Sequence, residues 1–347
     1  MPLAQTPQRL RSAAHKAIPV VGTMLLAVGA LALLSKAIPV DLESFVLAAL
    51  LPLVIARLPR ARSAADQARD CGVVMGTAVV AVELPALIAA QPLLGTAALI
   101  GCAVGSKWLR GRSRALGIAA VGAGLAVRLA LISLVAPGDD HIAQRALLAI
   151  GLVALVYLCW AGLNRLRGRS LPPRAATTAV SAQRAARTAQ RRSATLQMLL
   201  AFSASCLFGR WLFAAHWNWA ALSTFLVLTG PLNRAEVLNK GLHRLVGAAA
   251  GTVAAAALAG PFGAGSRSTL LALLVVVVVS IGLRSIAYAG WVAGITAALS
   301  LLYSYEGQDA GALLGIRLMA LAAGALLAIG AGWFVSPVHP SREPDAG

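Results

Sequence analysis

The feature that most constrains this chain is its succession of apolar segments. Runs of about 17–22 mostly apolar residues recur along the sequence, and each could cross a hydrocarbon core of about 30 Å as a helix. A helix satisfies its backbone hydrogen bonds internally, as lipid requires. Only 12% of the 347 residues are charged, about half the usual share in a soluble domain. The sequence therefore predicts an all-α, polytopic membrane protein.

The apolar segments divide into twelve predicted transmembrane helices. We expect them at 17–35, 42–56, 71–90, 92–106, 115–135, 145–163, 196–214, 219–233, 245–260, 268–283, 286–303 and 313–335. Pro85 and Pro92 leave it open whether residues 71–106 form two full spans or one broken helix.

The positive charge follows this span pattern. The net charge is +18, and the basic residues fall mostly in alternate short segments, as the positive-inside rule describes. The other segments carry acids such as Asp139, Asp140, Glu306 and Asp309. The distribution predicts a bacterial inner-membrane protein with both termini cytoplasmic, and it argues against nucleic acid as a partner.

The chain divides into two halves of six predicted spans. Residues 1–163 form the first membrane repeat, 164–195 a basic cytoplasmic linker, 196–338 the second membrane repeat and 339–347 a cytoplasmic tail. An even number of spans in each half predicts two parallel six-helix repeats, related as a pseudo-dimer by an axis along the membrane normal.

A short motif occurs once in each half. "RDCGVVMGT" (69–77) and "HRLVGAAAGT" (243–252) share an Arg-xx-Gly-xxx-Gly-Thr skeleton. The aligned residues of the skeleton are Arg69 with Arg244, Gly72 with Gly247 and Gly76 with Gly251. The glycines predict close helix packing. The arginines could extend to lipid headgroups, or they could pair as a cationic ring at the inner mouth of a central path.

Five further charged residues lie within or at the rim of predicted spans. Arg128, Arg210 and Glu83 lie inside apolar sequence, where charge is costly and usually faces a protein interior or a water-filled path. Glu83 is the candidate proton-coupling residue, and a structural ion pair is the alternative. Arg145 and Arg317 begin the sixth and twelfth spans near acidic loops, so they could form local salt bridges or line a substrate pathway.

Aromatic residues gather at the predicted outer edge of the membrane. Trp217, Trp219, Tyr303 and Tyr305 occur in "WLFAAHWNW" and "LLYSYEG". Such residues usually form an interfacial belt, and the alternative is an outer vestibule for an aromatic solute.

The sequence contains no recognisable enzyme or cofactor motif. Its four cysteines lie in or beside apolar runs without metal-binding spacing, and "GCAVGSK" (101–107) lacks the spacing of a phosphate-binding loop. We therefore predict no cofactor, no metal and no enzymatic activity.

Two stretches of the second half resemble the fusaric acid resistance (FUSC) family. These are "LNRAEVLNKGLHRLVGAAAGTVAAAAL" (232–258) and "LLGIRLMALAAGALLAIGAGWFVSP" (313–337). The resemblance implies a proton-motive-force-driven exporter of aromatic carboxylic acids, similar in membrane architecture to the aluminium-activated malate transporters. It places Arg244 and Arg317 at recurrent arginine positions of the family, with Arg69 and Arg145 as first-half counterparts.

The predicted function is export of small organic, aromatic carboxylic acids across the inner membrane. The predicted partners are the organic anion, the lipid bilayer and a periplasmic adaptor. A channel-like anion uniporter and an accessory membrane subunit of an efflux complex remain as alternatives.

Overall fold

The computed structural model describes residues 6–38, 40, 42–58, 63–133, 142–166, 181–230, 233–259, 265–284, 287–305 and 310–335. These residues form twelve α-helices and one short 3₁₀-helix, η2 (Ala214–His216), and contain no strand. The first six helices are α1 (Thr6–Leu34), α2 (Leu42–Ile55), α3 (Ala64–Ala90), α4 (Pro92–Trp108), α5 (Arg114–Ser133) and α6 (Ile142–Leu166). The others are α7 (Ser181–Phe213), α8 (Trp217–Leu228), α9 (Arg234–Ala259), α10 (Arg267–Leu283), α11 (Tyr288–Tyr305) and α12 (Ala310–Val335).

The helices have the length and composition of a multi-pass membrane protein. Six stretches of the described chain are long and apolar enough to cross a bilayer. They are Ala17–Leu34, Ala65–Ala90, Arg114–Ser133, Ala143–Leu163, Gln190–Leu228 and Gly315–Val335. Each of the twelve predicted spans lies largely within one helix of the structure, although several of these helices are too short or too polar to meet that criterion.

Residues 71–106 form two separate helices. Helix α3 ends at Ala90 and α4 begins at Pro92, with Gln91 between them in a non-helical conformation. The two helices pack tightly beside this junction, since a Cβ on Gly95 would lie 2.5 Å from the Cα of Ile88. Glycine is therefore required at position 95.

Helix α7 starts inside the segment predicted as a linker. It runs without a break from Ser181 to Phe213, so the predicted boundary between residues 195 and 196 lies within a continuous helix. Of the predicted linker, residues 167–180 lie outside the described residues.

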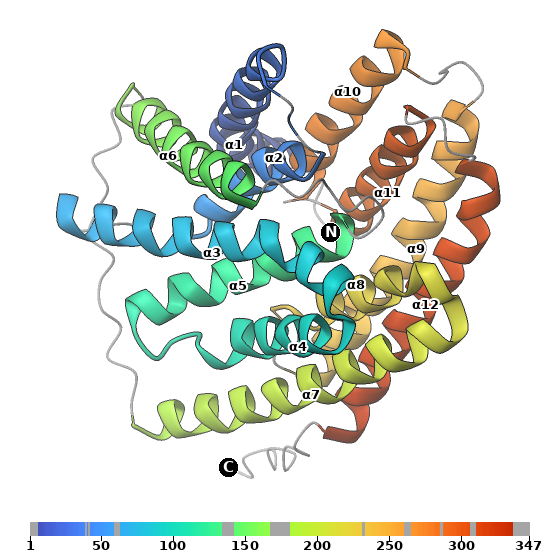
Figure 1. Cartoon of the computed structure of the whole chain (residues 1–347). Helices are drawn as coiled ribbons and strands as arrows, with labels where there is room; N and C mark the ends of the chain where they lie inside the picture. The colour runs from blue at the N-terminus through green and yellow to red at the C-terminus, as the bar shows by residue number, and fades with distance from the viewer. Residues whose placement is uncertain are drawn as a thin grey trace.

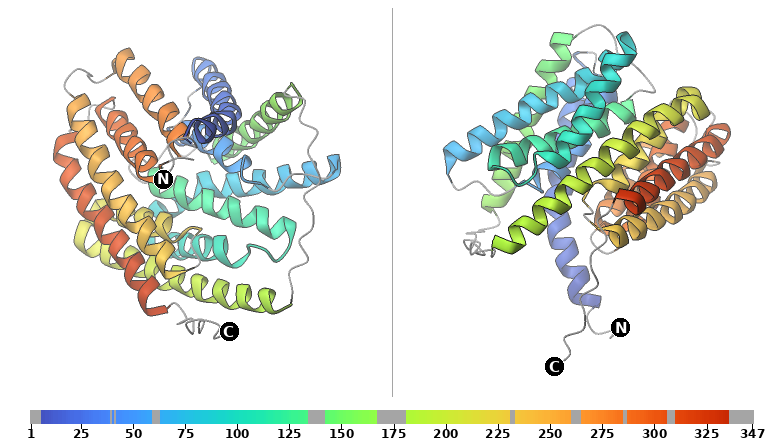
Figure 2. Two further views of the ribbon diagram at one scale, coloured as in Figure 1. Left: turned by 180° about the vertical axis from the view of Figure 1, so that it is seen from behind. Right: turned by 90° about the horizontal axis from the view of Figure 1, so that it is seen from below.

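The two halves of the chain lie side by side (Figures 1 and 2). In the first half α3 packs along α5 and α6, and in the second half α9 packs along α11 and α12. The halves meet where α4 lies along α7, where α5 meets α8, and where α1 meets α10. One buried core joins both halves, because it includes Leu125 and Leu129 of α5 together with Phe202 of α7 and Phe225 of α8.

The glycines of the repeated motif have different surroundings in the two halves. A Cβ on Gly247 would lie 2.5 Å from the Ala289 carbonyl oxygen, and one on Gly251 would clash with the Ala293 carbonyl. These two glycines therefore let α9 and α11 approach closely. Gly72 and Gly76 of α3 are exposed, and no atom lies within 4 Å of a Cβ built on either.

In the first half the close approach involves different residues. Thr77 of α3 lies against Gly122 of α5, where an added Cβ would clash with the threonine hydroxyl. The tight contact between α3 and α5 thus depends on the glycine of α5 rather than on those of α3.

This difference predicts opposite effects of one substitution at matched motif positions. Gly251→Ala should destabilise the protein by about 1–3 kcal/mol, because the added methyl overpacks the α9–α11 contact. Gly76→Ala should leave stability unchanged or raise it, because alanine is favoured over glycine within an exposed helix by about 0.5–1 kcal/mol. Thermal unfolding of both purified variants in detergent measures the effects. Equal changes in the two would contradict the assigned packing.

Candidate functional site

Six basic side chains from both halves form one group, which we call the cationic cluster. Its members are Lys107 at the end of α4, Arg110 in the turn after it, Arg128 of α5, Lys240 and Arg244 of α9, and Arg284 directly after α10. Lys240 lies within reach of four other positive charges of the group, those of Lys107, Arg244, Arg128 and Arg110. Tyr288 links the sixth to the group, because Arg244, Arg128 and Arg284 all interact with its side chain.

Arg244 is fixed deep in the cluster by hydrogen bonds. Its side chain is 7% exposed, and its Nε donates to the Ser223 hydroxyl at 3.1 Å. That hydroxyl in turn donates to the Leu321 carbonyl at 2.7 Å, while Tyr288 forms a second hydrogen bond with Arg244. The contact with Tyr288 is possible because Gly247, one turn after Arg244, lets α11 pack closely against α9.

Aromatic rings cover several of the cations. The guanidinium carbon of Arg128 lies 5.4 Å from the ring centroid of Phe225, and that of Arg284 lies 5.6 Å from the ring centroid of Trp291. The ammonium of Lys240 lies 5.7 Å from the ring centroid of Tyr288. These contacts offset part of the cost of removing the cations from water.

In the described part of the chain, carboxylates balance the cationic cluster only in part. The ion pairs recorded there are Arg114–Asp70 at 2.5 Å and Arg145–Glu83 at 3.2 Å, and neither includes a cluster member. Glu236 is the acid whose charge acts on Lys107.

Two donors in or beside the cluster lack acceptors among the residues that the structure describes. They are the buried Nε of Arg110 and the buried Nε1 of the neighbouring Trp291. Buried charges and donors are costly without partners, so the site is electrostatically suited to an anion.

The two lysines differ from the arginines in their ability to release a proton. Burial, followed by the charges of Lys107, Arg244, Arg128 and Arg110, lowers the pKa of Lys240 to about 7. Burial and then Arg110 lower the pKa of Lys107 to about 7, although Glu236 acts in the opposite direction. Guanidinium groups stay protonated in proteins. The cluster can therefore change its charge near neutral pH through its lysines.

The structure brings Arg128 and Arg244 together but leaves Arg69 apart. Arg69 is exposed on α3, whereas Arg244 is buried, so the two arginines of the repeated motif have different surroundings. The buried charged residue of the first motif is its neighbour Asp70, whose carboxylate accepts two hydrogen bonds from Arg114. A one-residue shift on a helix turns a side chain by about 100°, which accounts for the difference.

The other members of the cationic cluster fall between the predicted spans. Lys107, Arg110, Lys240 and Arg284 follow or precede apolar runs, where basic residues normally set topology. Nothing local distinguishes a basic residue in a solvated loop from one folded beneath a neighbouring helix. The contacts of Tyr288 and Trp291 depend likewise on the packing of α11 against α9.

The remaining predicted residues lie at the opposite ends of the helices. Arg145 is buried and forms the ion pair with Glu83, while the acids Asp139, Asp140 and Asp309 lie outside the described residues. Arg317 lies over Trp219, with 4.1 Å from its guanidinium carbon to the ring centroid. Arg210 donates to the Thr96 hydroxyl at 2.8 Å and lies 4.5 Å from the ring centroid of Trp217.

The aromatic side chains at these ends serve as partners for the arginines. Trp217 and Trp219 are buried beneath Arg210 and Arg317. Tyr305 is half-buried, and the side chain of Tyr303 lies outside the described part of the structure.

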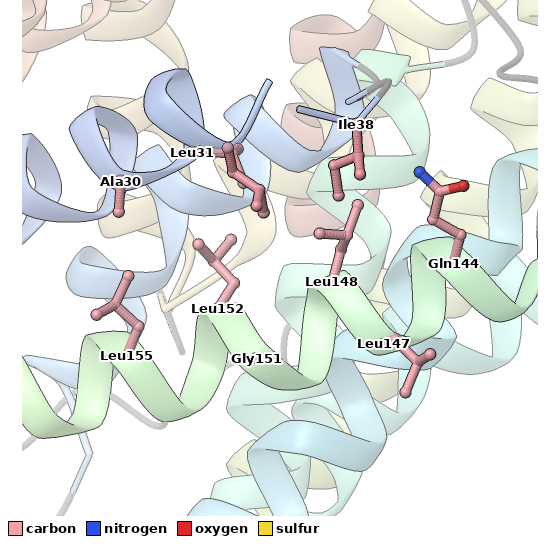
Figure 3. Close-up of a pocket in the computed structure, with 10 residues that line it drawn as sticks. Ala30, Leu31, Ile38, Gln144, Leu147, Leu148, Gly151, Leu152 and Leu155 are labelled. Carbon is pink, nitrogen blue, oxygen red and sulfur yellow. The ribbon is translucent and has the colours of Figure 1, made fainter. Parts of the chain in front are cut away.

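A cavity between α1 and α6 lacks the chemistry of the cationic cluster (Figure 3). Its volume is about 530 Å³, and aliphatic side chains such as Leu31, Leu148, Leu152 and Leu155 line it. Gln144 is the polar residue of the lining. Without a charged side chain, this cavity offers a carboxylate no electrostatic partner.

The ion pair between Glu83 and Arg145 predicts a specific pattern of stability. Glu83→Gln alone should lower stability by about 2 kcal/mol, because it leaves a buried guanidinium without its counter-charge. The double variant Glu83→Gln/Arg145→Met should be more stable than the sum of the single changes implies. A double-mutant cycle of unfolding in detergent measures this coupling. Strict additivity would show that the two side chains do not interact.

The second half of the chain matches a known family. Residues 200–331 fit the sequence profile of the family described as fusaric acid resistance protein-like. This region contains Lys240, Arg244, Arg284 and Arg317. No curated protein and no solved structure matches the chain significantly. Residues 200–331 are thus similar to the fusaric acid resistance protein-like family, and the apolar helices together with this match indicate a multi-pass membrane protein.

Proposed function

We propose that the chain exports small organic anions, in particular aromatic carboxylates, across the bacterial inner membrane. The observation that carries this proposal is the buried cationic cluster, which has aromatic neighbours and too few carboxylates to balance it. The family match supports a membrane transporter or resistance protein.

The cluster offers a carboxylate both charge and shape complementarity. Moving a bare carboxylate into a low-dielectric interior is unfavourable by many kcal/mol, and nearby guanidinium groups reduce that cost. Tyr288 and Trp291 lie with ring centroids 5.7 Å apart beside the cations, and flat aromatic surfaces favour contact with an aromatic solute. Arg244 and Lys107 are buried, whereas the other four members of the cluster are partly exposed, so water reaches part of the site.

The packing of the helices supports two parallel six-span repeats. Asp70 contacts Arg114 and Arg244 contacts Tyr288, and in each pair the residues are 44 positions apart. Likewise, Thr77 meets Gly122 and Gly251 meets Thr296, each 45 positions apart. Each second-half residue of these contacts lies 174 positions after its first-half counterpart. The two motif copies align with an offset of 175 positions, so the contacts and the motif differ by one residue in register.

This register makes the two halves electrically unequal. The first-half position holds the neutralised pair Asp70–Arg114, whereas the second-half position holds Arg244 with an uncharged Tyr288. The proposed anion site therefore centres on the second-half copy of this position, with Lys107, Arg110 and Arg128 added from the first half. The positive-inside pattern places this site toward the cytoplasm, where an exporter would collect its substrate.

Transport by arginine variants tests the site. Arg128→Gln and Arg244→Gln should each lower export of labelled fusaric or benzoic acid from proteoliposomes by about 10–100-fold, the factor expected for losing one charge-assisted hydrogen bond. Arg69→Gln is the matched control, because it removes an exposed arginine from the other motif copy, and its rate should equal that of the wild type. Wild-type rates in both cluster variants would overturn the site.

The same vesicles distinguish the modes of transport. Uphill movement with an imposed proton gradient supports a coupled exporter, and passive anion current supports a uniporter. An inactive chain that gains activity with a periplasmic adaptor would instead identify an accessory subunit and contradict the proposal.

A further inference from the structure

We infer that Lys240 takes up a proton when the cationic cluster binds its anion, so that this lysine is the proton-linked residue of the site. The inference rests on the proposed function, since it assumes that the cluster binds an organic anion.

The surroundings of Lys240 suit an amine in either protonation state. Its Nζ donates to the Thr229 carbonyl oxygen, a bond that a neutral amine can also form. The backbone also passes near Nζ at Gly230, which has a φ of 104°, because a Cβ built there would lie 3.9 Å from Nζ. The Tyr288 ring lies on another side. The lysine is thus held in place whether or not it carries charge.

All the charged groups recorded as acting on Lys240 are positive, whichever helix or turn they come from. They are Lys107 from α4, Arg110 from the turn after it, Arg128 from α5 and Arg244 from its own helix. Tyr288 of α11 is the uncharged titratable neighbour, and α8 offers the Thr229 carbonyl. On α12 the titratable residue described is Arg317, which lies at the far end of the helix.

Lysine deprotonation is the way in which an empty cluster can relieve this repulsion. The arginines keep their protons, and Glu236 already acts on Lys107, whereas within the described residues no acid acts on Lys240. An arriving carboxylate reverses the balance, because it favours the ammonium form. The step is R–NH₂ + H⁺ + A⁻ → R–NH₃⁺···A⁻, with the proton drawn from solvent.

Glu83 is less well placed than Lys240 to couple a proton to anion binding. Glu83 was the proton-coupling candidate from the sequence, but its carboxylate is committed to Arg145 at the opposite ends of the helices. Lys240 lies instead inside the group of side chains that would hold the anion.

The sign of the pH dependence follows from the lowered pKa of Lys240, which is about 7 in the empty site. Below that value the lysine already carries its proton, so binding takes up none and affinity is constant. Above it, each binding event requires a proton, and affinity should fall by up to tenfold per pH unit. The fall ends once the pH exceeds the raised pKa of the occupied site.

Calorimetry with benzoate as the probe tests the inference on the full-length protein in detergent. Titrations in buffers of different ionisation enthalpy give the number of protons bound. The wild type should take up close to one proton at about pH 8 and almost none at about pH 6. Lys240→Arg should bind benzoate at both pH values and lose most of the proton uptake at about pH 8, because arginine cannot release its proton and Glu236 already favours the charged form of Lys107.

Two matched controls isolate Lys240. His243→Asn removes the nearest histidine in sequence, which is exposed and bonded to the Asn239 carbonyl, and it should leave the uptake intact. Arg234→Gln removes a charge of α9 that faces Trp333 of α12, and it should do the same. Loss of uptake in His243→Asn, or its persistence in Lys240→Arg, would overturn the inference.

The outcomes for the wild type separate the two proposals. Benzoate binding without proton uptake at either pH contradicts the role of Lys240 and leaves the anion site standing. No binding of benzoate or fusaric acid contradicts the anion site itself, and the inference fails with it.

Discussion

The cost of burying charge in an apolar environment is the constraint on which the rest of this structure depends. A chain of apolar helices can keep a charged side chain inside only if it is paired, covered by aromatic rings or matched by a ligand. The first two solutions are used by the Glu83–Arg145 pair and by the contacts of Arg210 and Arg317 with tryptophans. The cationic cluster uses them incompletely, and this imbalance is the basis for proposing it as the anion site.

Close packing between helices makes the cluster possible. Gly247 and Gly251 bring α11 against α9, so that Tyr288 and Trp291 lie beside Arg244 and Arg284. Contacts between the halves then add Lys107, Arg110 and Arg128 from α4, the following turn and α5. A site built from several helices of both halves depends on their relative positions, so small shifts between the halves would change its charge balance and its access.

The difference between the halves gives the proposed repeat a functional meaning. The ion pair Asp70–Arg114 occupies the position that Arg244 and Tyr288 occupy in the second half. In the proposed repeat, one copy thus has an internal ion pair at this position, while the other has an arginine beside an uncharged tyrosine, the charge that we propose for the ligand. The exposed Gly72 and Gly76 show the same divergence, because their motif is retained without the helix contact seen at Gly247 and Gly251.

The sequence by itself determined the class of protein, the approximate positions of the twelve helices and the location of Arg128 within apolar sequence. These features follow from local properties: hydrophobic length, charge placement and motif resemblance. The tertiary structure decided which side chains meet. It separated the exposed Arg69 from the buried Asp70, paired Glu83 with Arg145, and brought Lys107, Arg110, Lys240 and Arg284 into the cluster. Helix rotation and crossing set such contacts, and one sequence position changes the direction of a side chain by about 100°, which neither composition nor motif spacing can resolve.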